Sequence, residues 1–456
     1  MTYEIPAIPV PKKTHGKPIA TYALIIINVA IYLISSFNNF FVQISDEWVN
    51  TFSYVPILIY VPTQWYRIIT SMFLHGDLFH IFFNMLFLYW FGKELELLLG
   101  SKKFLILYFA SGISATIFHT AFIPITGSIS LIIPAIGASG AISGLLGAYM
   151  LTYPGRRLSI CWFFVFIPLC FTTTAAVFLL FWFAMQVIYG YLRFGGVAFF
   201  AHVGGFIAGL ALIYLLKRSR KAPSEYFIPI PLPFEFHEPQ GLGSTAKFLL
   251  SLLLLAIIGG GIYSAIAAPN ASSMYIVNIS ACSNGTCESD EGAYTPVNDE
   301  TVTPSKELPR IAFNRIVWSG IIRASSPSYC NGNPIEINRR VNIKISGYTV
   351  ATILEGSATY DSNCVLVEFV GRIATQVVKV HPILGVVVGV SKDPIILDNV
   401  VFTSQDVAKD IGEVVIRPLA LLASLLTAAS MAVVVFKDRE LVEDEYFFMP
   451  MPGPYI

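Results

Sequence analysis

Eight runs of about 20 apolar residues, nearly free of charge, constrain this chain more than any other feature. A helix of that length crosses the hydrocarbon core of a bilayer. Only 13% of the residues are charged and 55% are hydrophobic, whereas soluble proteins carry about a quarter charged residues. These values exclude a disordered chain and argue against an ordinary soluble enzyme. We therefore expect a polytopic membrane protein, with apolar runs at 19–37, 72–91, 104–122, 131–153, 172–192, 195–216, 248–268 and 416–436.

The spacing of the runs divides the chain into six parts. Six runs follow one another closely, whereas the last two bracket a long polar region. The first run is too long for the core of a signal peptide and no small-residue cleavage site follows it, so we expect it to span the membrane. The predicted parts are a six-helix core (1–217), a cytoplasmic Pro-rich linker (218–247), helix seven (248–268), a β-rich extracellular domain (269–414), helix eight (415–436) and a cytoplasmic tail (437–456).

Basic residues predict the orientation of the chain. They cluster before the first run and then in alternate loops, which the positive-inside rule places in the cytoplasm. Both termini are then cytoplasmic, and 269–414 lies outside a cell membrane. The 29 basic and 29 acidic residues leave no net charge, so nothing indicates a nucleic-acid partner. The clusters are Lys12, Lys13 and Lys17; Lys93, Lys102 and Lys103; Arg156 and Arg157; Lys217, Arg218, Arg220 and Lys221; and Lys437 and Arg439.

The 269–414 region has the composition of an exported domain. Its stretches at 341–354, 364–380 and 384–390 are rich in Val and Ile and predict antiparallel strands, in a small sandwich or barrel. It contains no catalytic constellation, so we expect a structural role or recognition of a substrate or accessory protein. Three glycosylation sequons begin at Asn270, Asn278 and Asn284.

Cysteine usage fits this division of the chain. Four of the six cysteines lie in the 269–414 region and predict two disulfides, with three possible pairings. Two more, Cys161 and Cys170, lie in or near the membrane, where we expect them to pack as small apolar residues. The four external cysteines are Cys282, Cys287, Cys330 and Cys364.

Three polar side chains fall at matching positions in the apolar runs. Ser139, His80 and His202 each follow the start of their run by about seven or eight residues. These three runs all travel from outside to inside, so at 1.5 Å per residue the side chains share a layer about 11 Å deep. Ionisable groups at membrane depth are costly and indicate function by default. The coincidence therefore favours one common site.

The chemistry of that layer is the chemistry of acyl transfer. A serine becomes a nucleophile when a histidine takes its proton. No carboxylate lies near this depth, so a Ser139–His202 dyad is more economical than a full triad. His80 and Asn84, four residues apart, share a helix face and can donate to an oxyanion, as can the backbone N–H of Ser139. His75 and His80 are five apart, on different helix faces, and we expect no metal or cofactor.

Less specific interpretations remain for each residue. A serine in a spanning helix usually hydrogen-bonds its own backbone, and a lone buried histidine is as often structural as functional. A transporter would require charged residues or broken helices near the midplane, and no matched pair of such segments occurs. The close spacing of Gly140, Gly144 and Gly147, with Gly205 and Gly209, favours tight packing of helices four and six.

Taken together, these residues resemble the rhomboid family of intramembrane serine proteases. The resemblance spans about residues 19–217, and its motifs occur in the family's order on helices two, four and six. The GxSG motif alone is weak, but it is highly specific together with HxxxN and AHxGG. The motifs are Arg67-Ile68-Ile69-Thr70, His75 to His80-Ile81-Phe82-Phe83-Asn84, Gly92 to Glu96 with Leu99-Gly100-Ser101, Gly137-Ala138-Ser139-Gly140, and Ala201-His202-Val203-Gly204-Gly205 with Gly209.

The resemblance implies a fold and a reaction. It implies a six-helix rhomboid-like bundle with a water-filled cavity that opens outward, and it offers nothing for the C-terminal extension. With the two extra transmembrane helices that bracket the β-rich extracellular domain, the expected fold class is an all-α polytopic membrane protein. Ser139 would be the nucleophile, His202 the general base, and His80 with Asn84 the oxyanion-stabilising pair. The substrates would be membrane-spanning proteins cut within or near the bilayer. Residues 38–71 would form a membrane-embedded loop region, and helix five, with Trp182 and Phe183, a lateral gate.

Two positions depart from the family's pattern. Ser143 stands where many members carry an aromatic residue stacked on the catalytic histidine, so another group must hold His202 or it is held less tightly. The family's Trp-Arg pair is replaced by Tyr66-Arg67. Neither change removes a group that the chemistry needs. The competing hypothesis is an inactive rhomboid-like protein that binds membrane clients, although the intact Ser139 and His202 argue against it.

Overall fold

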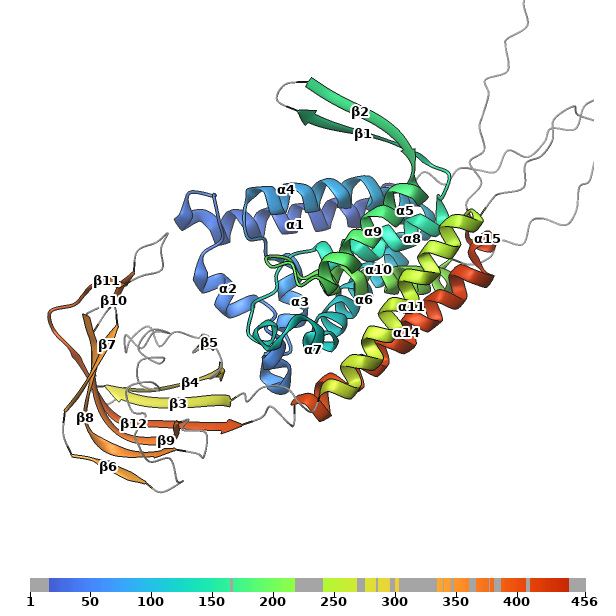
Figure 1. Ribbon diagram of the computed structural model, residues 1–456. Coiled ribbons are helices and arrows are strands. Elements are labelled where there is room, and N and C mark those ends of the chain that lie inside the picture. Colours follow the sequence, from blue (N-terminus) through green and yellow to red (C-terminus); the bar gives the residue numbers. More distant parts are fainter. Residues whose placement is uncertain are drawn as a thin grey trace, which may run out of the picture.

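The helical part of the protein contains a helix in each of the eight predicted runs (Figure 1). The computed structural model describes residues 16–164, 167–217, 241–268, 275–283, 286–295, 300–302, 334–338, 340–345, 348–360, 366–376, 378–380, 387–406 and 411–442. Within them, five helices are long and apolar enough to cross a membrane. The protein is therefore a helical membrane protein. The helices are α1 (Ile19–Ser36), α4 (Leu78–Phe87) continuing through η5 (Leu88–Gly92) into α5 (Lys93–Leu99), α6 (Ser101–Ala121), α8 (Ser139–Thr152), α9 (Ala175–Tyr191), α10 (Phe199–Leu216), α11 (Ser244–Ala267) and α14 (Arg417–Phe436).

Several helices begin later than their apolar runs, and local chemistry explains each delay. The side chain of Asp77 caps α4 by accepting a hydrogen bond from the backbone N–H of His80 (2.9 Å). Gly137, with φ of 122°, precedes α8, and Gly196, with φ of 86°, precedes α10. Such positive φ values favour glycine and interrupt a helix. The predicted starts at residues 72, 131 and 195 were therefore wrong.

Helices α8 and α10 pack with their backbones in close contact. A Cβ atom added to Gly205 would collide with the carbonyl oxygen of Gly140, and one on Gly209 with that of Gly144. A Cβ atom on Gly147 would likewise collide with the carbonyl oxygen of Phe206. The tight packing predicted from the glycine spacing is confirmed, and it brings the first turns of the two helices together.

The last two helices lie side by side against the six-helix part (Figure 1). Ser430 of α14 donates a hydrogen bond to the backbone oxygen of Ile207 on α10 (2.8 Å). Tyr191 of α9 donates to the backbone oxygen of Ala256 on α11 (2.7 Å). α11 and α14 thus form part of the helical body.

Two parts of the core were not predicted as the structure has them. Two antiparallel strands, β1 (Arg157–Phe164) and β2 (Ile167–Thr174), pair with each other and project from the helical body (Figure 1). Cys170 lies in β2, is exposed and is disulfide-bonded, so the expectation that it packs as a small apolar residue was wrong. The loop region after α1 contains short helices, including α2 (Asp46–Phe52), η2 (Pro56–Tyr60) and α3 (Arg67–Thr70).

The region between α11 and α14 contains antiparallel strands. Its described residues form an eight-stranded sheet in the order β5-β4-β3-β12-β9-β8-β6, with β7 paired to β8. β10 and β11 form a separate two-stranded sheet, and the expected sandwich or barrel stays a prediction. The strands are β3 (Tyr275–Ser283), β4 (Thr286–Thr295), β5 (Glu300–Val302), β6 (Ile335–Ile337), β7 (Val341–Ile345), β8 (Tyr348–Tyr360), β9 (Leu366–Thr375), β10 (Val378–Val380), β11 (Val387–Val390) and β12 (Ile395–Asp406).

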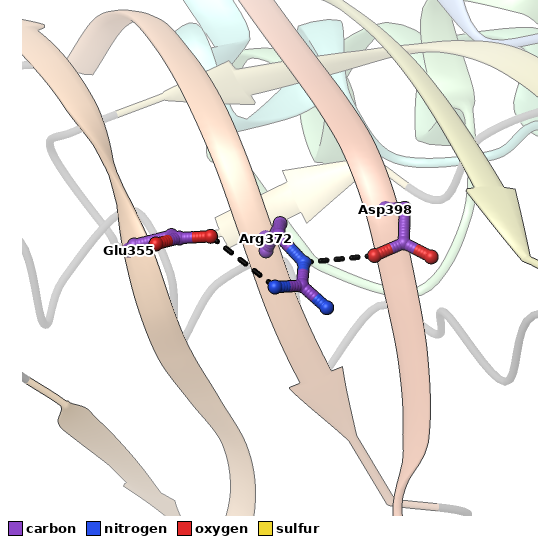
Figure 2. Close-up of polar contacts among 3 residues, drawn as sticks. All are labelled: Glu355, Arg372 and Asp398. Atoms are coloured by element: carbon purple, nitrogen blue, oxygen red, sulfur yellow. Dashed lines mark hydrogen bonds and ion pairs between the residues drawn. The ribbon is translucent and has the colours of Figure 1, made fainter.

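Cross-strand pairs fix the register of this sheet. Figure 2 shows the guanidinium of Arg372 on β9 between Glu355 on β8 (3.3 Å) and Asp398 on β12 (2.8 Å). All three side chains are exposed, so the cluster favours one register more than it adds stability. Cys282 and Cys287 are joined across β3 and β4. Cys330 and Cys364 lie outside the described residues, as do Asn270 and Asn284, while Asn278 is exposed on β3.

Candidate active site

Ser139 is the first residue of α8 and lies at the mouth of the α8–α10 contact. The helix begins here because Gly137 takes a positive φ and the N–H of Ile142 donates to the backbone oxygen of Ala138 (2.9 Å). The first N–H groups of a helix have no partner within that helix. The hydroxyl of Ser139 therefore lies beside backbone donors that point away from the helix.

His202 meets Ser139 from the first turn of α10. Its Nε2 atom lies 2.8 Å from the Oγ of Ser139, within hydrogen-bonding distance. Its Nδ1 atom lies 2.8 Å from the side-chain oxygen of Gln186, which comes from α9. Both ring nitrogens are thus engaged, one by the alcohol and one by an amide.

His80 approaches the same place from the first turn of α4. Its Nδ1 accepts a hydrogen bond from the backbone N–H of Gly76 (3.3 Å), so a neutral ring carries its proton on Nε2. A Cβ atom placed on Gly137 would lie 2.7 Å from His80 Nε2 and 3.5 Å from Ser139 Oγ. Because residue 137 is glycine, the space between the imidazole N–H and the alcohol stays open.

Asn84 lies one turn after His80 on α4 and is buried. Its amide donates one hydrogen bond to the backbone oxygen of His80 (2.8 Å). A carboxamide has a second N–H, and we keep its role as oxyanion donor as a proposal. The ring of His75 packs edge-on against His80, with centroids 5.1 Å apart. His75 precedes α4, so the helical spacing used in the sequence argument does not apply to it.

The helices that carry the site contain no acidic side chain, and the carboxylate beside it is that of Asp77, which caps α4 at His80. α4, α8, α9 and α10, all fully described, contain no Asp or Glu. No cluster of three or more His, Cys, Asp or Glu side chains that could hold a metal ion occurs in the described part of the chain. The chemistry available here is that of an alcohol, imidazoles, amides and backbone N–H groups.

The expected layer takes a different form from the one predicted. Ser139, His80 and His202 all lie in the first turn of their helices, rather than two turns below the start of a span. The runs begin before the helices do, so a count along a run does not give the position of a residue in its helix, and the depth of about 11 Å stays a prediction. What the three residues share is position at a helix N-terminus.

A comparison with protein-family models covers the sequence that forms this site. The family model described as Rhomboid domain matches residues 62–219, which contain all four candidate residues. This chain carries a rhomboid domain. The resemblance predicted from the motifs is therefore confirmed.

Three named relatives each match less than half of the chain. Rhomboid protein 1, mitochondrial, of Saccharomyces cerevisiae is 31% identical over 212 residues, covering 45% of this chain and 56% of the relative. Rhomboid protease GluP of Bacillus subtilis is 29% identical over 201 residues, covering 43% of this chain and 36% of the relative. Inactive RHOMBOID-like protein 8 of Arabidopsis thaliana is 32% identical over 143 residues, covering 31% of this chain and 35% of the relative. The chain thus spans about half the length of the first of these relatives and about a third of the length of the other two.

Sequence reasoning missed one polar contact of this rhomboid domain, that of Gln186. Ser143 donates to the backbone oxygen of Ser139 (2.6 Å) and does not replace the stacking aromatic residue. Gln186 instead contacts His202. The ring of Trp182 also lies near His202, with the two ring centroids 6.1 Å apart. Gln186 is the only side-chain amide in α9, and this isolated polar residue was the signal that could have revealed it.

Proposed function

We propose that this protein is an intramembrane serine endopeptidase that cleaves membrane-spanning proteins with a Ser139–His202 dyad. The observation that carries the proposal is the 2.8 Å distance between Ser139 Oγ and His202 Nε2. The rhomboid domain supports a protease-like function within the membrane. No cofactor enters the reaction.

In the first step His202 acts as the general base. The Nε2 atom takes the hydroxyl proton as Ser139 Oγ attacks the peptide carbonyl, and a tetrahedral intermediate forms. His202 then returns this proton to the leaving amine, which releases one product and leaves an acyl-enzyme. Water, activated by the same imidazole, hydrolyses the ester and restores Ser139.

The negative charge on the intermediate needs hydrogen-bond donors. His80 Nε2–H faces the space beside Gly137, the second amide N–H of Asn84 lies on the same helix face, and Ser139 offers its backbone N–H. Removing one such donor commonly costs about 10²- to 10³-fold in turnover. These groups are the proposed oxyanion site.

The surroundings of the site follow from the same proposal. The lipid bilayer of a cell membrane holds the protein, both termini are cytoplasmic, and residues 269–414 form a disulfide-bonded, glycosylated extracellular domain. Transmembrane proteins are the substrates, and this domain binds a substrate or an accessory protein. The six-part division at residues 217, 247, 268, 414 and 436 belongs to the proposal as well.

The test compares the purified full chain with Ser139→Ala on a labelled transmembrane substrate. We expect cleavage by the wild type and none above background by the variant. Equal cleavage by both would remove Ser139 as the nucleophile.

An inactive, client-binding protein is the second candidate function, because a relative of similar identity is named as inactive. This function predicts stoichiometric capture of membrane proteins without products. The intact contact between Ser139 and His202 favours the protease.

A further inference from the structure

We propose that Gln186 is a positioning residue that fixes the tautomer and orientation of His202. This inference rests on the proposed protease function and extends it to a group on α9. Three helices then build the reacting pair: α8 supplies Ser139, α10 supplies His202, and α9 supplies the amide that holds the imidazole.

The hydrogen bonds of Gln186 determine which atom faces the imidazole. Its side-chain nitrogen donates to the backbone oxygen of Trp182 (3.4 Å), one turn earlier on α9. The remaining oxygen lies 2.8 Å from His202 Nδ1. An amide oxygen only accepts hydrogen bonds, so Nδ1 must carry the proton of the neutral ring.

That tautomer is the one the reaction needs. With the proton on Nδ1, the lone pair of Nε2 faces Ser139 Oγ and can take its proton. The opposite tautomer would present N–H to the alcohol and could not act as a base. An aspartate serves this purpose in Ser-His-Asp triads, where the wrong tautomer costs about 10⁴-fold. Here a neutral amide does so without a buried charge.

Burial keeps water from replacing the amide of Gln186 at His202. Gln186 is buried, and the rings of Trp182 and Phe206 pack 6.1 Å apart beside it. Water has little access to replace the amide, so losing the side-chain oxygen leaves Nδ1–H without a partner. Among the described residues, His80 from α4 and His119 from α6 are the charged or titratable groups that act on His202.

Two substitutions separate positioning from packing. Gln186→Leu keeps the approximate shape but removes the acceptor, and Gln186→Glu keeps an acceptor and adds a charge. Thr427→Val is the matched control, because Thr427 on α14 is also buried and also hydrogen-bonded to its own helix (2.7 Å). All four full-length proteins are compared in lipid vesicles.

The main readout is the rate at which a fluorophosphonate probe labels Ser139, measured across pH. Labelling needs the nucleophile and its base but not the entry of a helical substrate past α9. We expect Gln186→Leu to lose about tenfold or more in labelling rate and in kcat, with KM nearly unchanged. The loss should not exceed the 10²- to 10⁴-fold that a general base supplies in total. Gln186→Glu should stay within a few-fold of wild type, with the acid limb of its profile at higher pH, because a carboxylate stabilises the imidazolium.

The results distinguish this inference from the proposed function. If the wild type neither labels nor cleaves, the protease proposal fails. If the wild type reacts and Gln186→Leu matches it, or Gln186→Glu falls as far as Gln186→Leu with no shift of the acid limb, the positioning role is overturned. Thr427→Val should match the wild type in labelling and in pH profile.

Discussion

Gly137 is the residue whose side chain would intrude most directly on the proposed oxyanion site. Its φ of 122° is strained for any other residue, and a Cβ atom would lie 2.7 Å from His80 Nε2. A methyl group there would push the imidazole away from Ser139. The GxSG motif thus has a physical reason for its first glycine as well as for its serine.

We therefore expect Gly137→Ala to lose about 10²-fold or more in turnover, comparable to the loss of an oxyanion donor. The measurement is the initial rate of substrate cleavage in detergent or vesicles. The matched control is Gly195→Ala, because a Cβ atom there would meet nothing within 4 Å. Wild-type turnover by Gly137→Ala would contradict the proposed position of the oxyanion.

At the residue scale, the sequence predicted which polar side chains come together but not that each lies in the first turn of its helix. Ser139 and His202 were expected together and lie 2.8 Å apart. Their roles remain predictions, since distance alone does not establish reactivity. Gln186 was missed because a single amide in an apolar run gives no partner by spacing, and its contact with His202 depends on how α9 and α10 meet.

Among the helices, the α8–α10 contact determines whether the dyad can form. Because a Cβ atom on Gly205 would meet the carbonyl oxygen of Gly140, one added methyl group must separate the helices. Ser139 Oγ and His202 Nε2 would separate with them.

Gly205→Ala should lower the free energy of unfolding by about 1–3 kcal/mol, as overpacking does, and should abolish cleavage. Thermal unfolding and substrate cleavage of the same sample measure the two effects. Gly259→Ala on α11 is the control, since a Cβ atom there meets nothing within 4 Å. An active, equally stable Gly205→Ala protein would show that the helices do not need this approach.

Glu96 of α5 anchors the start of α1 to the rest of the bundle. Its carboxylate accepts hydrogen bonds from the backbone N–H groups of Ala20 (2.9 Å) and Thr21 (2.7 Å) and from the hydroxyls of Thr21 (2.7 Å) and Ser101 (2.6 Å). The carboxylate thus satisfies N–H groups that the first turn of α1 leaves without partners.

Glu96→Ala should lower the free energy of unfolding by about 2–3 kcal/mol, because buried donors lose a charged acceptor. Glu47→Ala on α2, where the residue is exposed, should leave the free energy of unfolding nearly unchanged. Denaturant or thermal unfolding in detergent measures both. Equal stability of the two variants would contradict an anchoring role for Glu96.

Hydrophobicity located the helices but not their ends. Each apolar run contains a helix, because a run of about 20 apolar residues spans the bilayer core when it is helical. Asp77, Gly137 and Gly196 determine where helices begin through capping and positive φ, which an apolar count ignores. The hairpin of β1 and β2 was missed, and the last residues of its second strand, 172–174, were counted in the apolar run that contains α9.

At the scale of the whole molecule, the two chain segments that lead into and out of the β-rich region pack against the loops of the helical core. Ala268 at the end of α11 and Ile411 and Ile416 before α14 are buried in one cluster with Ile57 and Leu131 of the core loops. The proposed external domain therefore begins on the same end of the bundle as these loops. Strands at 341–354, 364–380 and 384–390 were predicted from Val and Ile content. β3, β4 and β12 are too mixed in composition to be recognised in this way.

The orientation of the chain in the membrane can be tested with single cysteines, one in the β-rich region and one after the last transmembrane helix. In a background without other reactive thiols, an impermeant maleimide should label Lys344→Cys on β7 in intact cells. It should label Arg439→Cys only after permeabilisation. Both positions are exposed, so access depends on the side of the membrane. The reverse pattern would contradict the orientation inferred from the basic loops.

The most direct test of the central claim is to find the covalent adduct on the reactive serine. The full chain is treated with a fluorophosphonate, digested and mapped by mass spectrometry, beside His202→Ala. We expect one phosphonylated residue, Ser139, and loss of that adduct when His202 is replaced, because the imidazole activates the alcohol 2.8 Å away. An unmodified Ser139 in the wild type, or equal labelling without His202, would contradict the account.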